Sequence, residues 1–181
     1  MTSGDEFAEF AETASPQLRR TAFLLCGNWH TAEDLVQTTL AKMFVSWRTI
    51  RRRDAVRAYA ARTLVNTYLA DKRSKRNAEI LTDRFPERPV EPHAPETRMV
   101  VLGVLATLPP RARAVVVLRY WEDLSVEQVA DMLGCSPGNV KSLAAGALGK
   151  LRAVLDEALT DYDPAERDPG EQHEVRDTRH G

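Results

Sequence analysis

The sequence has little cysteine, no long apolar run and almost no net charge, and each absence excludes a class of protein. Its only cysteines, Cys26 and Cys135, lie far apart, so neither a disulfide framework nor a cysteine zinc site is expected. Both are interpreted as small buried hydrophobes, with a redox-sensing thiol as the alternative. No apolar stretch approaches the roughly 20 residues of a membrane span, and the acidic start MTSGDEFAEF is unlike a secretory signal. We therefore expect a cytoplasmic protein without a membrane span.

Signatures of catalysis are also missing from the chain. There is no glycine-rich phosphate loop, no G-x-S-x-G and no H-E-x-x-H. The four histidines fall in expected turns, linker or tail rather than in a cluster (His30, His93, His173 and His180). The sequence therefore predicts neither an enzyme nor a bound metal or cofactor.

The net charge of −1 hides a strong asymmetry along the chain. Residues 47–76 hold ten lysines and arginines against two acids, whereas residues 157–181 hold eight acids against three arginines. A basic block is the electrostatic footprint expected of a nucleic-acid-binding protein, and the acidic tail is expected to be solvated and disordered.

Helical periodicity dominates and no strand pattern occurs, so the predicted fold class is all-α. We expect a first helical domain over residues 1–76 and a second over 97–156, with a tail over 157–181. Residues 77–96 contain FPERPVEPHAPE, whose four prolines predict an extended, flexible linker between the two domains.

Local signals predict where individual helices begin and end. Ser15-Pro16 is expected to start a second helix, which Gly27 ends, and Thr31–Asp34 reads as a capping box that starts a third. Ser125 is expected to cap a later helix that ends at Gly134.

The stretch LSVEQVADMLGCSPGNVKSL, Leu124 to Leu143, has the arrangement of a helix-turn-helix. Such a motif places the first turn of its second helix in the DNA major groove, where Asn suits adenine and Lys suits guanine or phosphate. The alternative is a generic helical hairpin. The residues expected to face the bases are Ser136, Gly138, Asn139, Lys141 and Ser142.

A basic helix follows the break at Arg51–Asp54. Aromatic rings among cationic side chains suit single-stranded bases, which need a flat surface to stack on and charges along the phosphates. A solvated helix face is the alternative. The residues on broadly one side, with two tyrosines interleaved, are Tyr59, Arg62, Asn66, Tyr68, Lys72, Arg73 and Arg76.

The helix expected over Thr31–Trp47 carries Glu33, Asp34 and Gln37 on its polar side. Acids at a helix start favour capping and solubility, so a plain structural role is one interpretation. A docking surface for a basic helical partner is the other.

Three separated stretches resemble, in the right order, the extracytoplasmic-function (ECF) group of bacterial sigma factors, most closely the compact actinobacterial type. They are AEDLVQTTLAKMFVSW, LVNTYLADKRSKR and LRYWEDLSVEQVADMLGCSPGNVKSLAAGALGKLR. The resemblance covers about residues 5–156. It implies a protein that binds core RNA polymerase, directs it to promoters and promotes their melting, and it suggests an anti-sigma partner.

The resemblance also implies residue roles. Contacts to core polymerase would come from Glu33, Asp34, Leu35, Gln37, Met43 and Trp47. Contacts to the melted non-template strand at the minus-ten element would come from Arg51, Arg52, Arg53, Asp54, Tyr59, Arg62, Asn66, Tyr68, Lys72, Arg73 and Arg76. Duplex contacts at the minus-thirty-five element would come from the helix-turn-helix residues above.

One departure and two rivals accompany the resemblance. Relatives commonly carry Arg where this chain has Leu143 and Gly146, so we expect weak intrinsic minus-thirty-five binding. A helix-turn-helix regulator that acts without polymerase is one rival, although no dimerisation heptads are visible. A sigma-mimicking interaction protein is the other.

Overall fold

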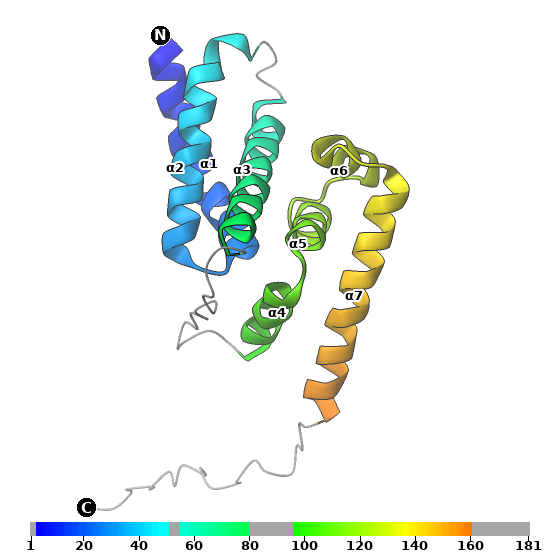
Figure 1. Cartoon of the computed structure of the whole chain (residues 1–181). Helices are drawn as coiled ribbons and strands as arrows, with labels where there is room; N and C mark the ends of the chain where they lie inside the picture. The colour runs from blue at the N-terminus through cyan, green and yellow to red at the C-terminus, as the bar shows by residue number, and fades with distance from the viewer. Residues whose placement is uncertain (1–2, 51–54, 80–95, 161–181) are drawn as a thin grey trace, which may run out of the picture.

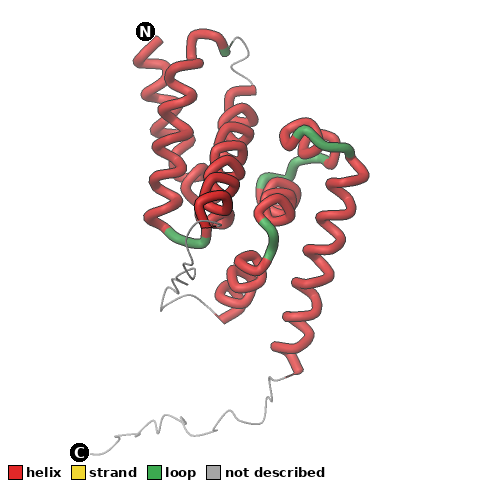
Figure 2. Tube along the Cα trace, in the orientation of Figure 1, coloured by secondary structure: helices red, strands yellow, loops and turns green. Residues whose placement is uncertain are grey.

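The computed structural model describes residues 3–50, 55–79 and 96–160, and every regular element in these ranges is helical, which confirms the all-α prediction (Figures 1 and 2). The predicted linker core, the break at Arg51–Asp54 and most of the tail lie outside the described residues. The elements are α1 (Ser3–Cys26), α2 (Trp29–Ser46), the short 3₁₀ turn η1 (Trp47–Thr49), α3 (Val56–Glu79), α4 (Glu96–Thr107), α5 (Pro110–Val116), the π turn η3 (Val117–Trp121), α6 (Val126–Leu133) and α7 (Pro137–Thr160).

The predicted helix start at Ser15-Pro16 is wrong, because α1 continues through Pro16. A proline inside a helix removes one amide donor and leaves carbonyls short of a partner. In the turn before the proline, side-chain hydroxyl groups donate hydrogen bonds to backbone carbonyls. Thr13 donates to the carbonyls of Glu9 and Phe10, both at 3.0 Å, and Ser15 donates to that of Ala11. None of these bonds reaches the Glu12 carbonyl, which Pro16 leaves without an amide donor. The helix continues because Ala14, Leu18 and Ala22, before and after the proline, are buried in the core. Gly27 ends α1 with φ +75°, as predicted.

The predicted capping box at Thr31 is also wrong, because α2 begins two residues earlier. Asn28 is its N-cap, with extended backbone and a side-chain oxygen that accepts the Thr31 amide at 2.9 Å. Asn is as good a cap as Ser or Asp, and its position directly after Gly27 makes the turn between α1 and α2 short.

The helix-turn-helix boundaries are confirmed in detail. Ser125 and Gln128 form a reciprocal capping box at the start of α6, with bonds of 3.1 and 2.7 Å. Gly134 ends α6 in the left-handed conformation, with φ 58°. The Ser136 hydroxyl then accepts the amide of Asn139 at 3.2 Å, which starts α7.

The core of α1, α2 and α3 is apolar and closed at one end by aromatic rings. Phe7 packs edge-on against Phe44 and Trp47, each with ring centroids 5.1 Å apart, and Phe10 lies 5.2 Å from Trp47. This cluster holds the first turns of α1 onto the end of α2.

The two helical units pack on each other instead of standing apart. The largest buried cluster runs from Leu18 and Leu64 of the first unit to Leu118, Val129 and Val140 of the second. Helix α1 contacts α4, α5 and η3, and α3 contacts α5 and α6. Figure 1 shows α5 beside α3 and the long α7 on the outside of the second unit.

Candidate nucleic-acid interface

Four of the predicted strand-binding residues form an exposed stripe along α3. Tyr59, Arg62, Asn66 and Arg73 recur at helical spacing, so they share one side of the helix. A ring, two guanidinium groups and an amide along one line can stack on bases, attract phosphates and donate hydrogen bonds. We call these four residues the α3 stripe.

Two further residues of α3 that were predicted to contact the single strand are less exposed to solvent. Tyr68 is only 3% exposed, and burial raises its pKa to about 12, with the nearby Arg113 opposing that shift. Lys72 is half-buried, with its Nζ 6.0 Å from the centre of the Tyr68 ring. Tyr68 is thus a core residue in this conformation and cannot stack on a base. The predicted contacts at Arg51–Asp54, and the side chain of Arg76, lie outside the described residues.

All five predicted duplex contacts at the start of α7 are exposed: Ser136, Gly138, Asn139, Lys141 and Ser142. The Ser136 hydroxyl oxygen already caps α7, so its first role is structural. Asn139 and Lys141 point outward from the first turns, where a helix-turn-helix meets the major groove.

The two positions at which the resemblance implies Arg, Leu143 and Gly146, differ in their surroundings. Leu143 is half-buried and packs against the core, whereas Gly146 is exposed and an added Cβ there would meet no atom within 4 Å. Only position 146 therefore offers free space for a phosphate-binding side chain.

Some of the α2 residues predicted to dock a protein partner are exposed, and others are buried. Asp34 and Gln37 are exposed, but Leu35, Met43 and Trp47 lie in the core. The last three can support the helix but offer almost no surface to a partner.

Two large apolar residues near the end of α2 are exposed, and sequence reasoning missed one of them, Val45. Phe44 is 58% and Val45 is 83% exposed. Val45 follows Gln37 by eight residues and Ala41 by four, so helical spacing alone could have placed it on the exposed side. We call Asp34, Gln37, Phe44 and Val45 the α2 face.

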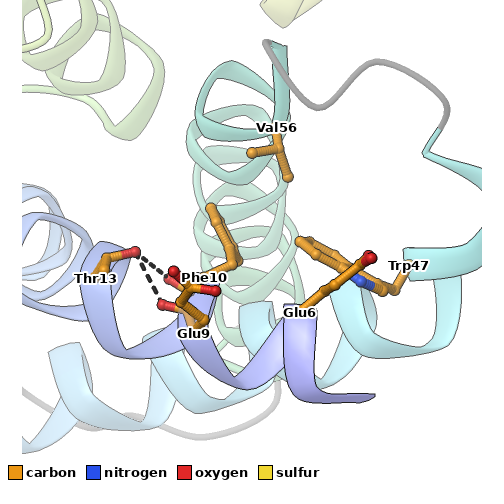
Figure 3. Close-up of a pocket in the computed structure, with 6 residues that line it drawn as sticks. All are labelled: Glu6, Glu9, Phe10, Thr13, Trp47 and Val56. Carbon is orange, nitrogen blue, oxygen red and sulfur yellow. Dashed lines mark hydrogen bonds between the residues drawn. The ribbon is translucent and has the colours of Figure 1, made fainter. Parts of the chain in front are cut away.

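A shallow cavity of about 320 Å³ lies where α1, η1 and α3 meet (Figure 3). Phe10, Trp47 and Val56 supply apolar surface, and Glu6 and Glu9 supply carboxylates. The carboxylates repel phosphate, so the nucleic-acid backbone is expected to follow α3 rather than α1.

The described residues contain no metal-binding cluster, and Cys26 lacks the features of a reactive thiol. Among the described residues no group of His, Cys, Asp and Glu side chains could hold a metal ion. The Cys26 Sγ lies 3.2 Å from the Asn28 carbonyl oxygen, and burial raises the pKa of this thiol. A thiol kept protonated in this way is a poor nucleophile. Within the same described ranges, no helix combines the length and the apolar character that crossing a membrane requires.

Comparison with known protein families gives two matches, one in each helical unit. Residues 10–78 match Sigma-70 region 2, and residues 104–153 match Sigma-70, region 4. The first match contains the α2 face and the α3 stripe, and the second contains the helix-turn-helix. A helix-turn-helix regulator that acts without polymerase is not favoured, because it does not account for the first match.

Similar proteins extend this result over nearly the whole chain. The chain is 37% identical over 171 residues to an RNA polymerase sigma-E factor of Streptomyces coelicolor, covering 92% of this chain and 96% of that one. It is 28% identical over 139 residues to the sigma factor SigV of Bacillus subtilis, covering 75% and 82%. The structure of RpoE in complex with the anti-sigma factor NepR from Bartonella quintana shares the fold, with a TM-score of 0.70 and 24% identity over 83% of this chain and 97% of that one.

The chain belongs to the sigma-70 family of RNA polymerase sigma factors, and within it to the compact extracytoplasmic-function group. It binds core RNA polymerase and directs it to promoter DNA.

Proposed function

We propose that this sigma factor divides its work among three exposed surfaces. The α2 face docks on core polymerase, the α3 stripe holds the non-template strand of the minus-ten element, and the first turn of α7 reads the minus-thirty-five duplex. The exposed α3 stripe carries the proposal, because its four residues combine stacking, charge and hydrogen bonding along one line.

Promoter melting follows from capture of the separated strand. Unstacking a base costs a few kcal/mol, which stacking and phosphate contacts must offset. Tyr59 supplies the ring, while Arg62 and Arg73 supply the charges. No bond is made or broken by the protein, so it acts as an initiation factor and not as an enzyme, and we place it in the cytoplasm with the polymerase.

An anti-sigma protein is the proposed regulatory partner. The similar structures include RpoE bound to NepR and CnrH bound to the cytosolic domain of CnrY, at 24% and 23% identity. These structures share the fold, and a partner of the same class is proposed for this chain.

A holoenzyme assay tests the strand-binding role. Core polymerase is reconstituted with wild-type protein, with Arg62→Ala, or with Arg57→Ala, and its binding to a fluorescent minus-ten single strand is titrated against salt. Arg57 is exposed on the same helix, on the opposite side from the α3 stripe. We expect Arg62→Ala to weaken binding by about 1–3 kcal/mol and to lower the salt slope by about 1, with Arg57→Ala close to wild type. Equal effects of the two variants would contradict the assignment.

A further inference from the structure

Two arginine side chains hold the two ends of α6 from outside that helix. Arg111, near the start of α5, donates an Nη2–H to the carbonyl oxygen of Leu133, the last residue of α6, at 2.8 Å. Arg119, in η3, donates an Nη1–H to the carbonyl oxygen of Leu124, which directly precedes Ser125, the N-cap of α6. We call Arg111 and Arg119 the α6 clamp.

The position of Arg111 suits this bond better than it suits α5. Arg111 is the second residue of α5, and the first turn of that helix contains no acidic residue to offset its charge. A cation near a helix start is unfavourable, whereas a cation at a helix end stabilises the carbonyl groups there that lack an intrahelical partner. The Leu133 carbonyl is such a group, so the guanidinium lies where both its charge and its N–H stabilise α6.

The π turn η3 helps Arg119 to reach the other end of α6. Side chains eight positions apart on a regular α-helix point about 80° away from each other. η3 is wider, closed by the Glu122 amide on the Val117 carbonyl oxygen at 3.1 Å, and it turns through a smaller angle per residue. The turn therefore brings Arg119 closer to the side of α5 that carries Arg111. Such turns are frequent at functional sites.

The other support of α6 does not fix its direction as closely. The buried side chains of α6 are Val129, Ala130 and Leu133, all apolar. Apolar burial is non-directional, so it holds the helix against the core but resists a small shift or rotation only weakly. A charge-assisted hydrogen bond has a preferred direction, and one at each end of α6 limits both movements.

The α6 clamp acts on the segment that leads into α7. Only two residues separate Leu133 from Ser136, whose hydroxyl caps α7. The exposed Asn139 and Lys141 follow in the first turns of that helix. A binding group must be held to within about 0.5 Å and 10–20° of its productive geometry, so a shift at the end of α6 would misplace both side chains.

We infer that Arg111 and Arg119 are positioning residues for minus-thirty-five recognition. Through two backbone carbonyls of the helix-turn-helix they set the angle at which the first turn of α7 enters the major groove. They thereby decide how well that turn distinguishes one base pair from another. This inference rests on the proposed role of the first turn of α7. An arginine that only bound a phosphate would add affinity equally on every sequence.

The first test replaces both guanidinium groups by ammonium groups. Arg111→Lys/Arg119→Lys keeps the net charge but loses the planar groups whose N–H donors fit the two carbonyls. Arg152→Lys is the matched control, at an exposed position toward the other end of α7. Each protein is reconstituted with core polymerase. Binding is titrated against salt on a promoter duplex that the wild-type holoenzyme transcribes, and on the same duplex with single minus-thirty-five base pairs changed in turn.

The readout is the ratio of affinities for the original and the changed duplex. The most harmful single change should weaken wild-type binding at least about fivefold. The clamp variant should bring this ratio below about twofold with an unchanged salt slope, because its charge is kept, and Arg152→Lys should keep the wild-type ratio. A wild-type ratio in the clamp variant would overturn the inference. A uniform loss of affinity with a lower salt slope would also overturn it, because that result identifies direct phosphate contacts.

The second test separates positioning from folding. A premelted template that carries the minus-ten element without a minus-thirty-five element does not need the first turn of α7. The clamp variant should transcribe this template within about twofold of wild type and should lose at least about fivefold on the complete promoter. Equal losses on the two templates would show that the arginines only stabilise the fold, against the inference. If the wild-type holoenzyme itself ignored every minus-thirty-five change, the proposed role of α7 would fail instead.

Discussion

The guanidinium of Arg19 on α1 lies 2.7 Å from the carboxylate of Glu33 on α2. This ion pair ties one of the acids expected to contact polymerase to the neighbouring helix. Asp34 and Gln37 next to it remain exposed, and Phe44 and Val45 extend the same side of α2 toward its end. The surface available for docking is therefore partly polar and partly apolar, and it differs from the set that sequence reasoning selected.

The first prediction distinguishes the residues of α2 that contact polymerase from those that only stabilise the fold. Phe44→Ala/Val45→Ser should weaken core polymerase binding at least about tenfold, or 1.4 kcal/mol, because it removes exposed apolar surface. Because Phe44 also packs against Phe7, its melting temperature should fall somewhat, and binding is compared at a temperature where the variant is still folded. Affinity is measured by fluorescence anisotropy with labelled protein and core enzyme.

Met43→Ala is the matched comparison within the same helix. Met43 is fully buried, so its truncation should lower the free energy of unfolding by about 2–5 kcal/mol. At a temperature where the variant is still folded, polymerase affinity should be near wild type. If Met43→Ala weakened binding more than the surface variant did, the α2 face would be wrongly assigned.

The second prediction concerns the open position on α7. Gly146→Ala should raise the free energy of unfolding by about 1 kcal/mol, since alanine favours a helix and an added Cβ meets no atom within 4 Å. Gly146→Arg should tighten binding to minus-thirty-five duplex and steepen its salt dependence, because a cation is added beside the expected phosphates. Urea unfolding and a salt-titrated gel shift measure the two effects. No change in the salt slope would mean that this side of α7 does not face DNA.

The third prediction is a loss of stability at high pH that depends on Tyr68. The pKa of this phenol is about 12 in the folded chain, against an ordinary value of about 10. The folded state therefore keeps a proton that the unfolded chain releases. The contribution is complete below pH about 10 and is lost as pH rises toward about 12, on the order of 2–3 kcal/mol in all.

Urea unfolding of wild type and Tyr68→Phe at several alkaline pH values measures this contribution. The wild type should lose stability more steeply with pH than the variant, since phenylalanine does not titrate. Absorbance at alkaline pH should show a tyrosine that ionises near pH 12 in the wild type and is missing from Tyr68→Phe. Parallel stability curves for the two proteins would contradict the burial argument.

Local signals predicted the helix-turn-helix better than the first helices. Ser125, Gly134 and Ser136 act through their own backbone and nearest neighbours, so the sequence alone determines their roles. Pro16 was misread because core burial of Ala14 and Leu18 around it keeps the helix continuous. The cap of α2 was misplaced because Asn28, and not Thr31, caps the helix.

Burial of individual site residues was harder to foresee, because it depends on packing between distant segments. Tyr68 lies among basic residues as a base-stacking tyrosine would, yet α3 turns it toward Arg113 and the core. The contact of Arg113 with Leu24 joins residues 89 positions apart in sequence, and no periodicity signals it. Such pairings emerge only when the two units are placed together.

Transcription in vitro by purified core RNA polymerase, with and without this chain, on bacterial genomic DNA tests the central claim most directly. Mapping the 5′ ends should reveal start sites that appear only when the chain is present, each preceded by one shared pair of upstream elements. Those starts should be lost with Arg62→Ala and kept with Arg57→Ala. An unchanged set of starts, with the chain bound to DNA but not recovered with core polymerase, would contradict the account.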